Sequence, residues 1–260
     1  MFSSSIVLVC LLCVCCAEVS PATAQTESRK EKLPKSVDLR PNFQRWELNT
    51  RCQGNRGTCS VFALTGGIEY ALARKQRHGT HLSMEFLNWA GHQAVGRKAD
   101  GGFFSELWKG YEQFGICPEE VLPYQDRFDA DLQPGEEVLK RAKQGQSPKL
   151  KFHWIKEWDV NTGLTEAHIT EIKRTLNRKW PVCGGLRWPK RAQWQEGVLQ
   201  MCPPEEVFDG HSILIVGYRD DPQQPGGGVF LIRNSGGDNR DGCLPYEYVQ
   251  AYMNDAAWIQ

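Results

Sequence analysis

The sequence lacks an excess of charge of either sign. Lys and Arg together number 31, as do Asp and Glu, so the formal net charge is zero. A nucleic-acid-binding surface needs clustered basic charge, and we therefore expect no nucleic-acid partner. The sequence also lacks internal repeats and low-complexity segments, which excludes repeat architectures. Its 260 residues, 40% of them hydrophobic, are enough for one large domain or two lobes around a common core.

No hydrophobic run is long enough to span a membrane, which takes about 20 residues. The longest run, IVLVCLLCVCCA over residues 6–17, has 12 residues, the length of a signal-peptide core. No Lys or Arg precedes it, and a buried N-terminal helix is the alternative interpretation. Small residues at 22–24 favour cleavage before Gln25, with cleavage after Ala17 as the alternative. We predict a signal peptide over 1–24, a secreted or periplasmic protein, and no membrane span after cleavage.

Close Cys/Cys or Cys/His ligand pairs of the kind that hold structural zinc are missing beyond this run. Four of the ten cysteines lie within it, and the other six are Cys52, Cys59, Cys117, Cys183, Cys202 and Cys243. Export permits disulfides, but the sequence does not choose among the pairings. We expect no metal and no organic cofactor.

The first half of the chain has a helical pattern. Apolar residues recur at helical spacing over 58–77, and Thr58 is a candidate N-cap. Two more helices are expected, one beginning at Ser83 and one over about 103–114. The adjacent glycines 66–67 weaken the first helix unless another element packs closely there.

The second half has a strand pattern. Short apolar runs over 149–160, 181–188, 211–219 and 228–234 predict strands, with one helix over 165–179. Pro34 and Pro41 predict that residues 33–42 form an extended segment without a helix. Together the two halves indicate an α+β protein of two lobes, and a cleft between such lobes is a common place for a site.

Cys59 begins the first predicted helix. Three roles are possible for it: a small buried hydrophobic residue, half of a disulfide, or a nucleophile. A helix N-terminus and a nearby imidazolium both lower a thiol pKa. His211 lies at the start of a predicted apolar strand, and Asn234 lies at the end of the next predicted strand, 23 residues later. Nucleophilic catalysis needs such a base with an orienting partner. Gln53, six residues before Cys59, could help to hold an oxyanion.

In this order and spacing the residues resemble the papain family of cysteine peptidases. His211 follows Cys59 by 152 residues and Asn234 follows it by 175, somewhat more than is usual in the family. The resemblance covers roughly residues 33–260. It is carried by the motifs LPKSVDLR, QGNRGTCS, LSMEFLNWAG, DGGFFSELWKGYEQFGICPEEVLPYQ, GHSILIVGY, NSGG and LPYEYV, the last of which is similar to bacterial members.

The resemblance implies a papain-like two-lobe fold with the active-site cleft between a helical left lobe and a β-barrel-like right lobe. The peptidase domain is expected over 34–260, with a mainly helical part over about 34–125 and a mainly β part over about 126–260. Residues 25–33 are expected to be a linker, too short for the family's inhibitory propeptide. Catalysis would use Cys59, His211 and Asn234, with Gln53 in the oxyanion hole. Substrate binding is expected at Gly101, Gly102, Phe104 and Ser212.

Several positions depart from the family pattern. Arg56 lies where the family usually has a disulfide cysteine, and Ser60 replaces the aromatic residue after the nucleophile. Gly236 replaces a tryptophan that shields the Asn–His hydrogen bond from water, and the loop after it is short. These changes motivate an alternative to the active enzyme, a catalytically weak or inactive homologue that binds other molecules.

The favoured hypothesis is a secreted, monomeric thiol peptidase that hydrolyses peptide or protein substrates through a thioester acyl-enzyme. A transferase that uses the same acyl-enzyme is a third reading, because thioesters accept amines as well as water.

Overall fold

The computed structural model describes residues 1–2, 32–146, 148–237 and 241–260. Contacts divide the chain into Met1–Lys32 and Leu33–Gln260. The predicted signal peptide lies almost entirely outside the described residues, and the described helices and strands all lie in the second unit. Within the described residues, no helix has the length and apolar character needed to cross a membrane.

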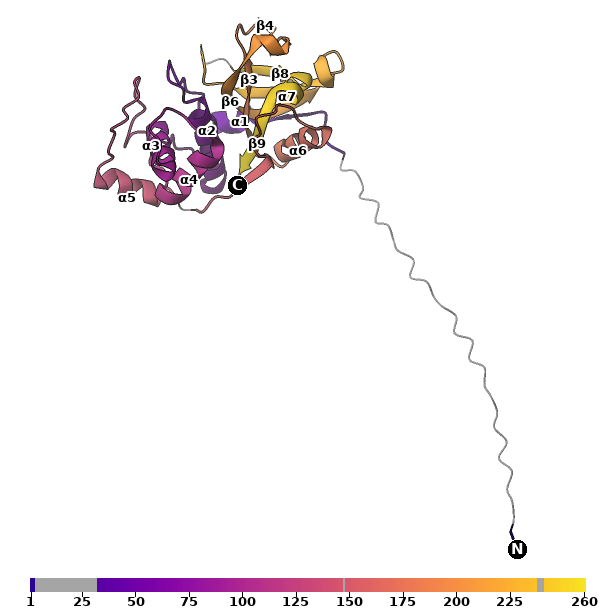
Figure 1. The fold of residues 1–260 in the computed structure, drawn as a ribbon, viewed down its shortest axis with the longest axis horizontal. Coiled ribbons are helices and arrows are strands. Elements are labelled where there is room, and N and C mark those ends of the chain that lie inside the picture. Colours follow the sequence, from indigo (N-terminus) through magenta and orange to yellow (C-terminus); the bar gives the residue numbers. More distant parts are fainter. Residues whose placement is uncertain (3–31, 147, 238–240) are drawn as a thin grey trace. The chain divides into compact units, whose positions relative to one another are not determined.

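Helices gather at one end of this unit (Figure 1). They are α2 (Cys59–Gln76), α3 (Met84–Val95), α4 (Phe104–Phe114) and α5 (Glu136–Gln144). The three helices predicted over the first half are confirmed as α2, α3 and α4. Ser83 caps α3, since its side chain accepts a hydrogen bond from the Phe86 N–H at 2.9 Å. The sequence did not indicate α5, whose Ala142 packs with Phe86 of α3, so the helical lobe includes residues beyond 125.

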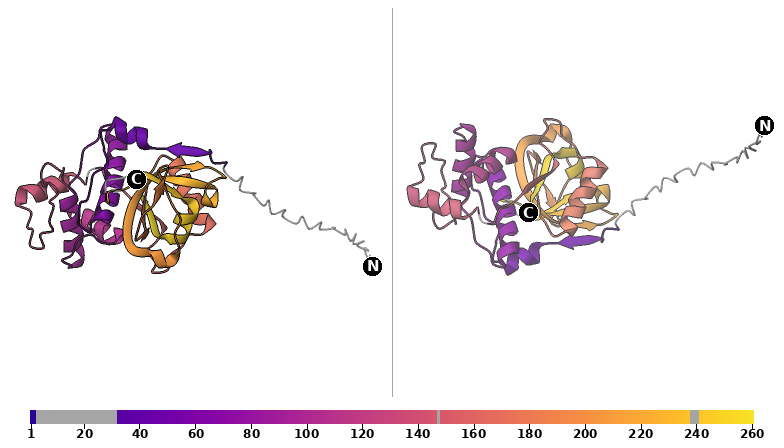
Figure 2. Two further views of the ribbon diagram at one scale, coloured as in Figure 1. Left: turned by 90° about the horizontal axis from the view of Figure 1, so that it is seen from above. Right: turned by 90° about the horizontal axis from the view of Figure 1, so that it is seen from below.

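The other part of the unit is built on a curved sheet, seen beside the helices in both views of Figure 2. In the described part of the chain the sheet has nine strands in the order β2-β9-β3-β6-β7-β8-β5-β4, with β1 paired to β6. All pairings are antiparallel except that of β5 with β8. The strands are β1 (Ser36–Asp38), β2 (Phe152–Lys156), β3 (Val182–Pro189), β4 (Trp194–Gln195), β5 (Val198–Leu199), β6 (Val207–Asp220), β7 (Gly228–Arg233), β8 (Gly242–Pro245) and β9 (Met253–Ile259).

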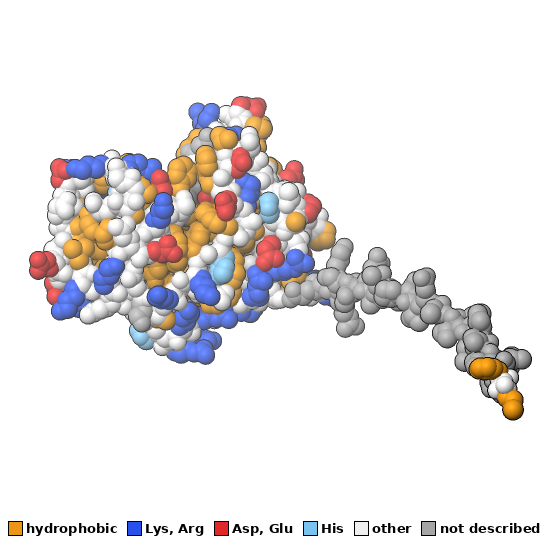
Figure 3. All heavy atoms as spheres, turned by 60° about the horizontal axis from the view of Figure 1, so that its bottom comes forward, with side chains coloured by type: hydrophobic (Ala, Val, Ile, Leu, Met, Phe, Trp, Pro, Cys, Tyr) orange, Lys and Arg blue, Asp and Glu red, His pale blue; other side chains and the backbone are white. Residues whose placement is uncertain are grey.

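Two further α-helices, α6 and α7, pack on this sheet. The predicted helix over 165–179 is confirmed as α6 (Glu166–Asn177), which packs on β2 and β6, while α7 (Tyr246–Tyr252) packs on β3 and β8. Short 3-10 turns lie at η1 (Pro204–Glu206) and η2 (Pro225–Gly227). On the face drawn in Figure 3, side chains of both charge signs are interspersed around hydrophobic groups, in keeping with the zero net charge.

The α2 helix lies between the two parts of the unit. Its residues are buried continuously from Cys59 to Ala73. A Cβ atom built at Gly66 would lie 3.1 Å from Leu214 Cδ2, and one built at Gly67 would lie 3.1 Å from Cys183 Sγ. The two glycines therefore allow the sheet to approach the helix closely. This is the close packing that the sequence analysis required for glycines within a helix.

Three local expectations were wrong. Residues 33–42 are not extended throughout, because α1 (Arg40–Arg45) begins there with Pro41 in its first turn. Proline is tolerated at that point since the first N–H groups of a helix have no intrahelical acceptor. Thr58 does not cap α2 with its side chain, and its hydroxyl instead bonds the Tyr124 hydroxyl at 2.7 Å. Strand β6 begins at Val207, so His211 lies inside the strand instead of at its start.

Replacing Gly67 by alanine tests the close approach of the sheet. Alanine raises helix propensity by about 1 kcal/mol, but the added methyl group would press on Cys183 and Ile259. Overpacking of this kind costs about 1–3 kcal/mol, so Gly67→Ala should lower the free energy of unfolding by about 1 kcal/mol in urea titrations. The exposed control Lys109→Ala should change it by less than about 0.5 kcal/mol. A Gly67→Ala protein more stable than the parent would contradict the packing argument.

Candidate active site

Cys59 is the first residue of α2 and faces the sheet. It is a free cysteine, and only 8% of its surface is exposed. Its sulfur donates to the carbonyl oxygen of Gly210 at 3.6 Å, and Gly210 directly precedes His211 on β6. The structure therefore brings together the start of α2 and the part of β6 that carries His211.

His211 and Asn234 meet across two neighbouring strands. Nε2 of His211 lies 2.8 Å from Oδ1 of Asn234, which directly follows β7. The backbone N–H of Gly236 donates to the same Oδ1 atom at 3.0 Å. Because β6 and β7 are antiparallel, with Leu214 opposite Arg233, the start of one lies near the end of the other. The predicted proximity of the two side chains is thus confirmed, whereas their catalytic roles stay predictions.

Gln53 is held by four hydrogen bonds, one of which its carbonyl accepts from the Tyr124 hydroxyl at 3.0 Å. Its Nε2 donates to the Arg56 carbonyl at 2.8 Å, and its Oε1 accepts from the Ser235 hydroxyl at 2.9 Å. Its backbone N–H donates to the Ser235 carbonyl at 2.9 Å. A hollow of about 350 Å³ has Gln53, Cys59, His211 and Asn234 in its lining. All four residues singled out for chemistry therefore border one space.

A buried arginine fixes the loop that leads to Cys59. The Arg56 guanidinium bonds Glu85 at 2.5 Å and makes two hydrogen bonds to Asp100, at 2.8 and 3.0 Å. It also donates to the Gln125 carbonyl at 2.8 Å and lies 4.6 Å from the centre of the Tyr124 ring. Burial by itself lowers the pKa of Arg56, but the bonds to Asp100 and Glu85 outweigh burial and raise it. An ion-pair cluster thus crosslinks this loop to α3 and to the segment that leads to α4.

A second cavity of about 420 Å³ also borders Cys59 and His211. Three of the four predicted substrate-binding residues line it, namely Gly102, Phe104 and Ser212. Gly101 is not in its lining. The Gly101 N–H donates to Asn88 Oδ1 at 3.0 Å, and its carbonyl lies 3.0 Å from His92 Nε2. Its backbone groups are therefore used inside the helical lobe.

Aromatic side chains from both lobes meet at the rim of this cavity. Phe103, which directly precedes α4, and Trp158, in the segment after β2, have ring centres 4.9 Å apart. Both residues are more than 40% exposed, at 43% and 48%. The sequence analysis missed Trp158 because nothing in its local pattern indicates which part of the helical lobe it reaches.

Asp255 on β9 is a second lining residue that the sequence analysis missed. It is 3% exposed, and its Oδ1 accepts the Gly185 N–H at 2.8 Å. Burial raises the pKa of this carboxyl to about 6, against the lowering effects of the Gly185 bond and of Lys156. Asp255 belongs to no motif, and only the pairing of β9 with β3 places it opposite Gly185 in the cleft.

Burial also dominates the pKa values of the central pair. It raises the pKa of the Cys59 thiol, although hydrogen bonds from the backbone and side chain of Ser212 and from the start of α2 lower it. It lowers the pKa of His211, although the Asn234 bond raises it. Both directions favour the neutral thiol and the neutral imidazole. The helix N-terminus lowers the thiol pKa as expected, but desolvation is the larger effect here.

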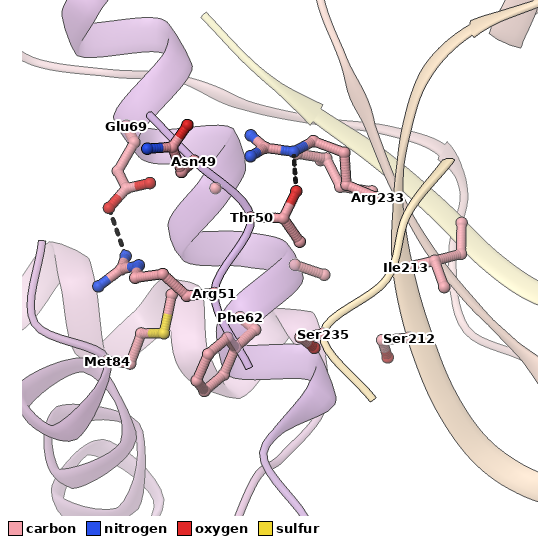
Figure 4. A pocket seen from close by; sticks show the side chains of 13 residues that line it. Asn49, Thr50, Arg51, Phe62, Glu69, Met84, Ser212, Ile213, Arg233 and Ser235 are labelled. Carbon is pink, nitrogen blue, oxygen red and sulfur yellow. Dashed lines mark hydrogen bonds and ion pairs between the residues drawn. The ribbon is translucent and has the colours of Figure 1, made fainter. Parts of the chain in front are cut away.

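A small cavity of about 40 Å³ lies behind the site, between α2 and β6 (Figure 4). It is too small for a substrate side chain, and its lining includes the ion pair of Arg51 with Glu69 at 2.5 Å. Arg233 donates to the Leu48 carbonyl and to the Thr50 hydroxyl, both at 2.7 Å. These bonds tie the end of β7, next to Asn234, to the segment that leads to Gln53.

The six cysteines of the described residues are all free. No group of three or more His, Cys, Asp or Glu side chains in the described part of the chain is arranged to hold a metal ion.

Comparison with known proteins identifies the family. The model of the papain family cysteine proteases matches residues 33–245. The chain belongs to the papain family of cysteine proteases. A cathepsin L-like proteinase of Fasciola hepatica is 22% identical over 214 residues, which are 81% of this chain and 59% of that protein. This chain therefore spans less than two thirds of the curated relative that it matches.

Solved structures of papain-family proteins share the fold. Xylellain, a cysteine protease from Xylella fastidiosa, superposes with a TM-score of 0.68 at 22% identity, covering 88% of this chain and 87% of xylellain. Digestive procathepsin L 3 of Tenebrio molitor larval midgut gives a TM-score of 0.64 at 20% identity, covering 89% of this chain and 71% of that one. The predicted α+β, papain-like two-lobe fold is thus confirmed.

Removing the Arg56 guanidinium tests the ion-pair cluster. Arg56→Met should lower the free energy of unfolding by about 3–5 kcal/mol, because it leaves the buried Glu85 carboxylate without its partner. The control is Arg40→Met, which breaks an ion pair with Asp38 whose side chains are 47% and 39% exposed. Exposed pairs contribute about 0–1 kcal/mol. Equal losses in urea titrations of the two variants would contradict a crosslinking role for Arg56.

Asp255 makes stability depend on pH. Its carboxyl ionises less readily in the folded protein, where its pKa is about 6, than in the unfolded chain, where it is near 3.8. The protonated form therefore favours folding at low pH, and this contribution is lost as the pH rises through about 4 to 6. Between pH 4 and 7 the parent should lose about 2–3 kcal/mol relative to Asp255→Asn. Parallel stability curves for the two proteins across this range would contradict a raised pKa.

Proposed function

We propose that this chain is a secreted thiol peptidase that hydrolyses peptide bonds through Cys59, His211 and Asn234. The observation that carries the proposal is the 2.8 Å contact between His211 Nε2 and Asn234 Oδ1. That contact orients the imidazole beside the hollow that Cys59 borders. A nucleophile, a base and a group that orients the base are the parts that covalent hydrolysis requires.

The proposed reaction begins with a neutral pair. His211 accepts the proton of the Cys59 thiol as the sulfur attacks the carbonyl carbon of the scissile bond. The Cys59 N–H and the second Nε2 hydrogen of Gln53 stabilise the oxyanion, since the first is bonded to the Arg56 carbonyl. The imidazolium then protonates the leaving amine, and a thioester remains on Cys59. Water, deprotonated by His211, hydrolyses the thioester and restores the thiol.

The two cavities beside Cys59 support a polypeptide substrate that lies across the cleft. The larger one is lined by Phe104 and Leu186 from opposite lobes, with Asp255 as its buried acidic group. We propose that it takes a largely apolar side chain from the acyl side of the cleaved bond. The hollow on the Gln53 side takes the leaving-group side.

A catalytically weak binding homologue is the second candidate. Gly236 supplies no side chain over the Asn234–His211 contact, and burial disfavours charge on both Cys59 and His211. Either feature would slow proton transfer without preventing peptide binding in the cleft. Secretion belongs to the proposal on the strength of the apolar run over residues 6–17.

Digestion of a mixed peptide library tests the function. The protein without residues 1–24 is kept reduced and assayed from about pH 4 to 8, with products read by mass spectrometry. Cys59→Ser and His211→Ala should each lower turnover by about 1000-fold or more, because they remove the nucleophile or the base. Asn234→Ala should cost about 10- to 100-fold, because it orients the base without transferring the proton.

Cys52→Ser is the matched control, since Cys52 is an exposed free thiol outside both cavities. Its activity should equal that of the parent. Cleavage that survives Cys59→Ser would refute the assignment of the nucleophile. A folded parent that binds peptides without cleaving any would favour the binding homologue.

A further inference from the structure

We propose that Trp188 is a positioning residue that covers the His211 imidazole and keeps water from its bond to Asn234. This inference rests on the proposed function. The centres of the Trp188 and His211 rings lie 4.6 Å apart, with the ring planes at 57°. Both residues line the hollow on the leaving-group side of Cys59.

The cover matters because this hollow is open to solvent through the cleft. A hydrogen bond is stronger where the surroundings are apolar and water does not compete for its atoms. The His211–Asn234 hydrogen bond lies at the border of the hollow. If the imidazole were uncovered, water would compete with Asn234 for the hydrogen bond to His211 Nε2. The indole of Trp188 presents a large apolar surface to the ring without offering an acceptor for Nε2.

The register of β3 against β6 places Trp188 beside His211, next to a bulge. Strands β3 and β6 pair Leu186 with His211 and Trp188 with Phe208, so two residues of β6 lie opposite the single residue Arg187. A bulge of this kind re-aims side chains and is common beside active sites. Gly210 lies within it at φ 93°, a conformation that glycine adopts readily. Leu186 and Trp188 lie on the same face of β3 because they are two residues apart. The pairing of Leu186 with His211 places the His211 side chain on that face as well.

Position 236 is unable to provide the cover. A Cβ atom built there would lie 3.0 Å from His211 Cε1 and 3.4 Å from Asn234 Oδ1. The ring is therefore already close to the Gly236 backbone on that side. The aromatic surface over His211 comes instead from Trp188 on β3. Trp194 packs beside Trp188, with its ring centre 6.2 Å from that of Trp188.

A double-mutant cycle separates positioning from a simple lining role. The substrate carries glycine after the cleaved bond, so that no side chain enters the hollow. In the parent background Trp188→Ala should lower kcat about tenfold while KM changes less than about twofold. In an Asn234→Ala background the same substitution should lower kcat less than about twofold, because the bond it protects is gone. Trp188→Phe should restore most of the loss.

Trp180→Ala removes a tryptophan that packs on Arg74 and Trp258, away from both cavities, and should leave kcat unchanged. Equal losses in the two backgrounds, or a rise in KM alone, would overturn the positioning role. If Trp188→Ala does not fold, the cycle is repeated with Trp188→Leu, which keeps an apolar side chain but not the ring.

The failure of the proposed function has a different signature. A folded parent that does not cleave peptides would refute the function, whatever the Trp188 variants do. The cycle is then read from the rate of Cys59 alkylation by iodoacetamide, which reports how readily His211 takes the thiol proton. An alkylation rate that Trp188→Ala leaves unchanged in the parent background would overturn the positioning role independently.

Discussion

The buried guanidinium of Arg56 is the constraint on which the site depends. It is 6% exposed and must keep its charge, so Glu85 and Asp100 have to remain beside it. Through Glu85 it holds α3, and through Asp100 it holds the segment that leads to α4. Its carbonyl also positions the Gln53 amide. One residue therefore links the proposed oxyanion loop to one wall of the substrate cavity, and this link does not depend on the redox state of any cysteine.

The second requirement is that α2 and the sheet come close enough for Cys59 to reach β6. Gly66 and Gly67 make this possible, because larger side chains at those positions would meet Leu214 and Cys183. The same helix has its N-terminal N–H groups at Cys59, where they favour a thiolate. Packing of the middle of α2 thus decides where its end, and with it the sulfur, lies relative to His211.

Much of this arrangement was predictable from the sequence, and the reasons are local. Apolar periodicity predicted α2 and α4, and the Ser83 cap predicted α3. The antiparallel pairing expected of two successive apolar strands predicted that His211 and Asn234 lie close together, although His211 lies inside its strand. Trp188 and Asp255 were not predictable in this way. The position of Trp188 relative to His211 follows from the pairing of β3 with β6, and that of Asp255 follows from the pairing of β9 with β3. Both are properties of strand register, which a single sequence does not specify without its partner strands.

Burial of Cys59 and His211 has two opposite effects on the proposed proton transfer. Burial raises the thiol pKa of Cys59 and lowers that of His211, so charge separation is disfavoured before substrate arrives. The same lack of water strengthens each fixed hydrogen bond, including those of Ser212 to the sulfur and of Asn234 to the imidazole. A site built this way gains most if the proton moves as the sulfur attacks, when the oxyanion donors can share the new charge. The apolar cover over His211 and the polar contacts beneath it are therefore parts of one arrangement.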